Sequence, residues 1–133
     1  MNILPATITD IKTSEHLSSL EVSVFGEPFH LLLAEPTDPV RMQGTPVTLV
    51  FKETEVILAE SAETASANVH TAHITALIPG TVLTEVTLAY HDITIKALVS
   101  SAMFCADSFR IGQTISWLVN PSEISLLRET HEH

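Results

Sequence analysis

The sequence has little cysteine, few aromatic residues and little positive charge. Cys105 is the only cysteine among 133 residues, which excludes an intrachain disulfide and fits a reducing compartment such as the cytoplasm. Six lysines and arginines stand against 16 aspartates and glutamates, a net charge of −10. Because nucleic acids and anionic membranes are bound through lysine and arginine, this balance argues against both partners. With 5% aromatic residues, the chain also lacks the stacking surfaces of single-strand binders.

Long apolar runs and catalytic motifs are missing as well. No apolar segment approaches the roughly 20 residues that a membrane-spanning helix needs. The sequence has no nucleophile elbow, no phosphate-binding loop and no paired carboxylates that can be placed together. Yet 45% of the residues are hydrophobic, a high share for a chain with 17% charged residues. The composition predicts a binding protein that is not an enzyme, with more apolar surface than a monomer should expose.

The chain contains one unit twice. Gly44–Leu58 and Gly112–Leu126 each have a turn glycine, an apolar strand, a short polar hinge and a second apolar strand (112 − 44 = 68). Near the start, Asn2 and Ile8 recur as Asn68 and Ile74 (68 − 2 = 66). In between, the best match pairs Glu21, Val22 and Val24 with Glu85, Val86 and Leu88 (85 − 21 = 64). Such a self-match indicates two copies of one structural unit.

Strand signals dominate both copies, because apolar and polar residues alternate with a period of two. Five short strands and a helical turn after the third predict an all-β fold of two tandem, small OB-like barrels. The predicted domains are a first barrel at 1–60, a linker at 61–67, a second barrel at 68–129 and a tail at 130–133. The predicted strands are Ala6–Lys12, Leu20–Val24, Phe29–Leu33, Val47–Lys52 and Val56–Ala59, and then Ala72–Ile78, Val82–Ala89, Ile93–Val99, Thr114–Val119 and Ile124–Leu127. The helical turns are expected at Pro39–Gln43 and Ser101–Phe109.

Several strands carry apolar residues on both faces. Singly exposed leucines are common on protein surfaces, and a shifted strand register would also give this pattern. Since each unit is near the size at which a lone core is marginally stable, we favour a buried contact between units. The residues opposite the inferred cores are Leu32, Val50, Ile57, Leu98, Leu118 and Leu127.

The two units resemble a known family. Each opens with an asparagine and ends with Gly-x-x-[Val/Ile], followed by a hinge of the Lys-x-[Ser/Thr]-x-[Val/Ile] type. In length and strand order the units resemble the molybdenum-binding Mop or TOBE domain, and two in one chain resemble the di-Mop molbindins. The resemblance covers Asn2–Glu60 and Asn68–Glu129. It implies binding of molybdate or tungstate at interfaces between barrels, in a homotrimer of six barrels that serves molybdenum storage and homeostasis in the cytoplasm.

The resemblance also implies where the oxyanion is bound. The family's Lys-Ala-Ser type hinge corresponds here to Lys52-Glu53-Thr54, the first hinge, and to Asn120-Pro121-Ser122, the second hinge. The second hinge has asparagine in place of lysine, and its proline lacks a backbone donor. The family's threonine at the end of the third strand corresponds to Ser100, and its Ser-Ala-Arg-Asn segment to residues 65–68, without the arginine. The predicted oxyanion ligands are Lys52, Glu53, Thr54, Ser66, Asn68, Ser100, Asn120 and Ser122.

The residue chemistry of the first hinge fits a tetrahedral dianion, which needs N–H and O–H donors and positive charge. On a regular strand, Lys52 and Thr54 would point to the same side and Glu53 to the other. The alternative is that these are ordinary solvated residues. The chain would then be an oligomeric structural or regulatory TOBE module whose oxyanion sites are degenerate or absent. For the histidines we predict no metal site, because His70 and His73 would face opposite sides of a strand.

Overall fold

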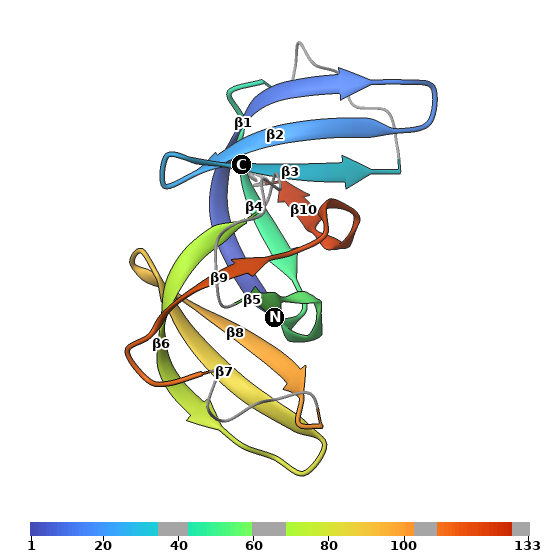
Figure 1. Ribbon diagram of the computed structural model, residues 1–133. Coiled ribbons are helices and arrows are strands. Elements are labelled where there is room, and N and C mark those ends of the chain that lie inside the picture. Colours follow the sequence, from blue (N-terminus) through green and yellow to red (C-terminus); the bar gives the residue numbers. More distant parts are fainter. Residues whose placement is uncertain (35–42, 60–68, 103–108, 129–133) are drawn as a thin grey trace, which may run out of the picture. The chain divides into compact units, whose positions relative to one another are not determined.

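The computed structural model describes residues 1–34, 43–59, 69–102 and 109–128. This part of the chain is all-β, with strands β1 to β10 and two short 3-10 helices, η1 (Glu53–Glu55) and η2 (Pro121–Glu123) (Figure 1). It forms two compact units, each containing one curled five-stranded sheet. The predicted class, two tandem OB-like barrels of about five strands each, is confirmed. Within the described residues, no helix has the length and apolar character required to cross a membrane.

Unit 2 comprises Ile3–Phe51 and Asn120–His133. Its sheet has the order β10-β4-β1-β2-β3. Neighbouring strands are antiparallel in the pairs β10 with β4, β1 with β2 and β2 with β3. The inner face of the sheet buries alternate residues, as in Leu20, Val22 and Val24 of β2, all at 0% exposure. The strands are β1 (Asn2–Thr13), β2 (Ser18–Val24), β3 (Glu27–Leu33), β4 (Pro46–Phe51) and β10 (Ser125–Arg128).

Unit 1 comprises Met1–Asn2 and Lys52–Val119. Its sheet has the equivalent order β5-β9-β6-β7-β8. Its core contains an aromatic cluster in which His70, Tyr90 and Trp117 contact one another, with ring centroids 5.1–5.9 Å apart. The strands are β5 (Ile57–Ala59), β6 (His70–Ile78), β7 (Leu83–Tyr90), β8 (Ile93–Ser100) and β9 (Thr114–Leu118).

The two sheets exchange their closing strands. Strand β5, from the first sequence repeat, pairs with β9 of the second repeat, with Leu58 opposite Trp117. Strand β10, from the second repeat, pairs with β4 of the first, with Leu126 opposite Leu49. The predicted domains 1–60 and 68–129 therefore do not coincide with the compact units, whose boundaries fall after Asn2, Phe51 and Val119. A short strand can complete any sheet that offers a free edge, so the repeat pattern alone does not determine its partner.

The register of the hairpins corrects the internal alignment. Val22 pairs with Ile8 in unit 2, and Leu88 pairs with Ile74 in unit 1, so Val22 and Leu88 are equivalent (88 − 22 = 66). The offset of 64 inferred for this strand is wrong by two residues. Because side chains alternate with a period of two, a shift of two leaves every apolar residue on the same face. The sequence pattern could not reveal the error.

Strands β1 and β6 each contain a β-bulge at equivalent positions, and an equivalent threonine lies inside each bulge. In β1 the pairing register shifts between Ile8 and Asp10, and in β6 it shifts between Ile74 and Ala76. The threonine inside each bulge, Thr9 or Thr75, donates its hydroxyl to a carbonyl of the neighbouring strand, at 3.0 and 3.3 Å. A bulge increases the twist and bends the strand, which curls each sheet.

Gly44 and Gly112 hold equivalent turns. Each has a positive φ, +84° and +90°, a conformation that glycine adopts without steric cost. Each donates its N–H to the carbonyl oxygen of the bulged strand, Gly44 to Ile8 at 2.8 Å and Gly112 to Ile74 at 2.7 Å. The repeated glycine therefore places the fourth strand of each repeat beside the first.

The expectation of two-faced apolar strands holds for most of the residues named. Leu32, Ile57 and Leu127 are 45–56% exposed, and Leu98 and Leu118 are half-buried. Val50 differs, because it is only 7% exposed within unit 2 itself, next to the buried Phe51. The predicted helical turns at Pro39–Gln43 and Ser101–Phe109 fall largely outside the described residues.

Gly80, in the β6–β7 loop, is required by close packing. A Cβ atom at this position would lie 2.3 Å from the carbonyl oxygen of Leu83, which is backbone and cannot rotate away. We expect Gly80→Ala to lower the free energy of unfolding by about 1–3 kcal/mol, the usual cost of overpacking. Denaturant unfolding monitored by Trp117 fluorescence measures the free energy of unfolding. The matched control is Thr81→Ala at the exposed neighbouring position; equal stability of the two variants would contradict the expectation.

Candidate functional site

The first hinge is a 3-10 turn that packs against strand β8 of unit 1. Lys52 precedes η1 with an extended backbone (φ −78°, ψ 152°), and its carbonyl oxygen accepts a 3.0 Å hydrogen bond from the Glu55 N–H. Its side chain makes no capping hydrogen bond and is exposed, as is that of Thr54. Since the segment is a turn with about three residues per turn, strand alternation does not govern the directions of these side chains. The strand alternation that would place Lys52 and Thr54 on one side therefore does not apply here.

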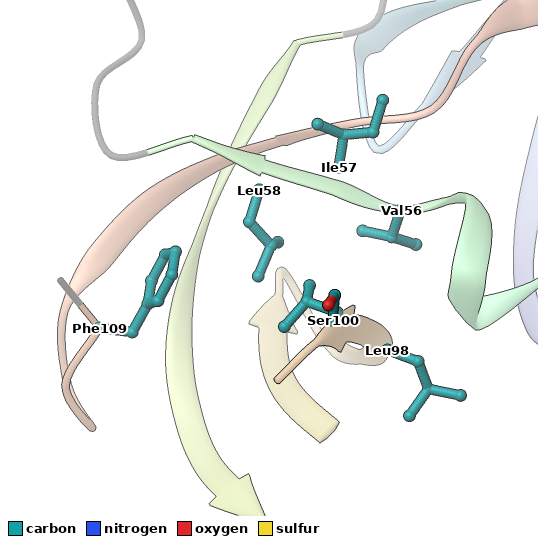
Figure 2. Close-up of a pocket in the computed structure, with 7 residues that line it drawn as sticks. Val56, Ile57, Leu58, Leu98, Ser100 and Phe109 are labelled. Atoms are coloured by element: carbon teal, nitrogen blue, oxygen red, sulfur yellow. The ribbon is translucent and has the colours of Figure 1, made fainter. Parts of the chain in front are cut away.

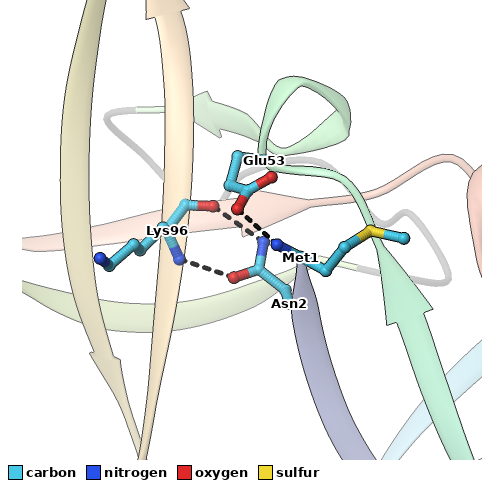
Figure 3. Close-up of polar contacts among 4 residues, drawn as sticks. All are labelled: Met1, Asn2, Glu53 and Lys96. Atoms are coloured by element: carbon cyan, nitrogen blue, oxygen red, sulfur yellow. Dashed lines mark hydrogen bonds and ion pairs between the residues drawn. The ribbon is translucent and has the colours of Figure 1, made fainter.

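Glu53 carries a carboxylate rather than a hydrogen-bond donor at the hinge. Its Oε2 accepts a 2.5 Å charged hydrogen bond from the Met1 ammonium group (Figure 3). This hydrogen bond, together with one from the Glu53 backbone, lowers the pKa of the Glu53 carboxyl below its ordinary value. The side chain is therefore ionised at neutral pH. An ionised carboxylate repels a dianion, so Glu53 is the least suitable of the ligands that the resemblance implies.

Asn2 ties the start of the chain to the edge strand β8. Its Nδ2 donates to the Lys96 carbonyl oxygen and its Oδ1 accepts from the Lys96 N–H, both at 2.8 Å (Figure 3). The side-chain amide thus pairs with the edge as a strand backbone would, and it is 4% exposed. Sequence reasoning missed this role, although the recurrence of Asn2 as Asn68 was the available signal.

Ser100 lies at the end of β8, in the same unit as the first hinge. It is exposed and lines a pocket of about 450 Å³ whose other walls are apolar (Figure 2). The next residue, Ser101, anchors this end of the strand: its hydroxyl donates to the Gly80 carbonyl oxygen at 2.7 Å. The apolar lining residues are Val56, Ile57, Leu58, Leu98, Val99 and Phe109.

The second hinge has the same backbone and different side-chain chemistry. η2 packs against β3 of unit 2, and Asn120 is its N-cap (φ −60°, ψ 132°). The Asn120 Oδ1 accepts hydrogen bonds from the Ser122 N–H at 3.1 Å and from the Ser122 hydroxyl at 2.9 Å. Asparagine at the N-cap and proline at the first helical position both favour starting a helix. The departure from the lysine pattern therefore has a structural role.

At the end of β3, the equivalent of Ser100 carries no hydroxyl. Leu33 pairs with Ser18 as Val99 pairs with Thr84, so Ala34 corresponds to Ser100. In this register the first repeat has no counterpart of the Ser100 hydroxyl.

The charges of the described residues are also unequal between the units. Unit 1 contains three lysines or arginines and four carboxylates, whereas unit 2 contains two and five. Lys52 is the only cation in either hinge. Of the eight residues predicted to hold the oxyanion, unit 1 combines Lys52, Glu53, Thr54 and Ser100, and unit 2 holds Asn120 and Ser122. Ser66 and Asn68 lie outside the described residues.

The histidines give no metal centre in the part of the chain that the structure describes, where no group of three or more histidine, cysteine, aspartate or glutamate side chains could hold an ion. His70 is 6% exposed and packs between Tyr90 and Trp117. The Nδ1 of His73 lies 2.9 Å from the hydroxyl of Thr114 on the paired strand.

The chain thus has the fold of a tandem OB-like β protein, in which each unit carries one hinge beside an edge strand, β8 or β3. No family model matches the sequence, and no curated protein matches it. Among solved structures, the chain is similar to the cytoplasmic molybdate-binding protein ModG, crystallised with molybdate bound, with a TM-score of 0.83 and 18% identity. The match covers 96% of each chain. It shows that the fold is shared over the whole length.

The Asn2 contact gives a testable prediction. Asn2→Ala leaves the N–H and C=O of Lys96 without their partners, so we expect unit 1 to lose about 1–3 kcal/mol of stability. Hydrogen exchange at the Lys96 amide should become faster. Lys96→Ala is the matched control, because Lys96 contributes only its backbone to this contact. Unchanged exchange in Asn2→Ala would show that the contact does not hold β8.

Proposed function

We propose that this protein binds molybdate, or the chemically similar tungstate, in the cytoplasm and so stores the anion for molybdenum homeostasis. The observation that carries the proposal is the likeness to molybdate-bound ModG over 96% of both chains. The first hinge supports it, because Lys52 and Thr54 supply a charge and a hydroxyl on one exposed turn.

The chemistry of a tetrahedral dianion favours this turn. Charge-assisted hydrogen bonds are stronger than neutral ones, and Lys52 has an ammonium group that makes no ion pair among the described residues. Thr54 adds a neutral donor. The Glu53 carboxylate is already occupied by the Met1 ammonium group, which offsets its charge locally. Since exposed charges are screened over about 8 Å at physiological salt, the acidic residues that lie farther than this from the hinge matter little at this position.

An exposed turn does not enclose an anion by itself, so we further propose that the first hinge meets a barrel of a neighbouring chain in a homotrimer of six barrels. Exposed apolar residues support this assembly. Ile57, directly after the hinge, is 51% exposed, and Leu32 and Leu127 are 45% and 56% exposed. Burying such residues between copies would stabilise units that are individually small.

A second candidate function is a structural or regulatory module that assembles without binding an oxyanion. The observation in its favour is the second hinge, which has no lysine and whose serine is bonded to Asn120. Under this alternative the assembly remains and titration with molybdate gives no heat.

The order of affinities among hinge variants tests the oxyanion site. We expect Lys52→Ala to weaken molybdate binding by about 1.5–3 kcal/mol, the scale of a hydrogen bond to a charged group. This corresponds to roughly a tenfold to somewhat more than a hundredfold loss of affinity. Thr54→Ala should cost less, because its hydroxyl is neutral, and Asn120→Ala should cost least.

Calorimetric titration of each variant with molybdate, tungstate and sulfate gives the measurement. Lys12→Ala, an exposed lysine of unit 2, serves as the control for loss of one charge. Absence of binding by the unaltered protein, or equal affinity in Lys52→Ala, would favour the structural module.

The assembly is tested separately. Native mass spectrometry and light scattering at micromolar concentration should give the mass of three chains. Ile57→Asp should lower this mass, because a charge would enter a desolvated contact while the fold, which leaves Ile57 exposed, is retained. A monodisperse monomer of the unaltered protein would contradict the trimer.

A further inference from the structure

The two hinges differ in one contact that decides which of them has free donors. We infer that only the first hinge of each chain binds the oxyanion, because the hydrogen bonds between Asn120 and Ser122 close the second hinge. This inference rests on the proposed function and goes beyond it by assigning unequal roles to two sites with the same backbone.

The backbone conformation does not distinguish the two hinges. Both have an extended residue before a three-residue 3-10 turn. Both turns are closed by the same hydrogen bond, from Glu55 N to Lys52 O at 3.0 Å and from Glu123 N to Asn120 O at 2.9 Å. Both also pack against an edge strand of their unit, β8 or β3. Any difference in anion binding must therefore come from the residue types rather than from the backbone conformation.

In the second hinge, the donors that a dianion would use are engaged. Both the N–H and the hydroxyl of Ser122 point to one acceptor, the Asn120 Oδ1. An anion would have to break both hydrogen bonds and displace a partly negative oxygen. The residue between them, Pro121, has no N–H to offer.

The first hinge cannot form this contact. A lysine ammonium group is a donor with no acceptor atom, so Lys52 cannot accept a hydrogen bond from the N–H or the hydroxyl of Thr54. Lysine in place of asparagine at this position removes the acceptor that engages the second hinge's serine, and it also adds a positive charge. One residue position therefore controls both the availability of donors and the charge.

The surroundings add to the difference. Strand β8, beside the first hinge, ends in the exposed hydroxyl of Ser100, whereas the equivalent position after β3 is Ala34. The second hinge also contains no cation. Each of these features disfavours an anion at the second hinge.

Exchanging the hinge residues tests the inference. One variant, Lys52→Asn/Glu53→Pro, gives the first hinge the chemistry of the second. The reciprocal variant, Asn120→Lys, removes the acceptor from the second hinge and adds the positive charge of the first. Calorimetry and native mass spectrometry with molybdate count the bound anions per assembled particle, and the particle mass and thermal unfolding show whether each variant is folded.

We expect the first variant to lose all molybdate binding and the reciprocal variant to bind twice as many anions as the unaltered protein. Because a converted hinge could fail to fold, Ser122→Ala provides a milder test: it removes one donor from the second hinge and should leave number and affinity unchanged. Retention of half of the sites in the first variant, or a loss of sites in Ser122→Ala, would show that the second hinge binds the anion. No binding by the unaltered protein would instead remove the proposed function itself.

Discussion

Strand pairing at the two open sheet edges is the interaction on which the other features depend. Strand β9 takes β5 as its partner, and strand β4 takes β10, although each pair joins residues from different sequence repeats. A sheet edge presents unpaired N–H and C=O groups, and pairing satisfies them. Because each closing strand follows its hinge directly, the pairing also fixes where the hinges lie, with η1 beside β8 and η2 beside β3.

The same backbone supports different chemistry in its two copies. Leu4 and Leu49 fill the core of unit 2 at the positions where unit 1 has His70 and Trp117. The hinges differ in a similar way: lysine in one copy leaves the turn open, and asparagine in the other engages the following serine. Duplication of a unit therefore preserves backbone geometry more strictly than side-chain chemistry, since backbone pairing depends little on side-chain identity.

The high net negative charge of the chain is compatible with an anion site because the relevant charges are local. Lys52 stands on an exposed turn, and the neighbouring carboxylate of Glu53 is paired with the Met1 ammonium group. Distant carboxylates are screened by salt. Placing an oxyanion at this turn thus requires only that a few donors converge, and the contact with a neighbouring barrel proposed above would supply the remaining donors.

The sequence by itself determined the class of fold, the number of repeats, the turn glycines and the position of both hinges. The alternation of apolar and polar residues and the glycines that mark turns are local signals, which can be read without knowing the tertiary contacts. Only the tertiary structure decided which sheet each closing strand completes, the offset of 66 in the hairpins, the pairing of Asn2 with Lys96 and the engagement of Ser122 by Asn120. These features depend on hydrogen bonds between residues whose partners the linear pattern does not specify. A two-residue slip or an exchanged strand leaves the alternation of apolar residues unchanged.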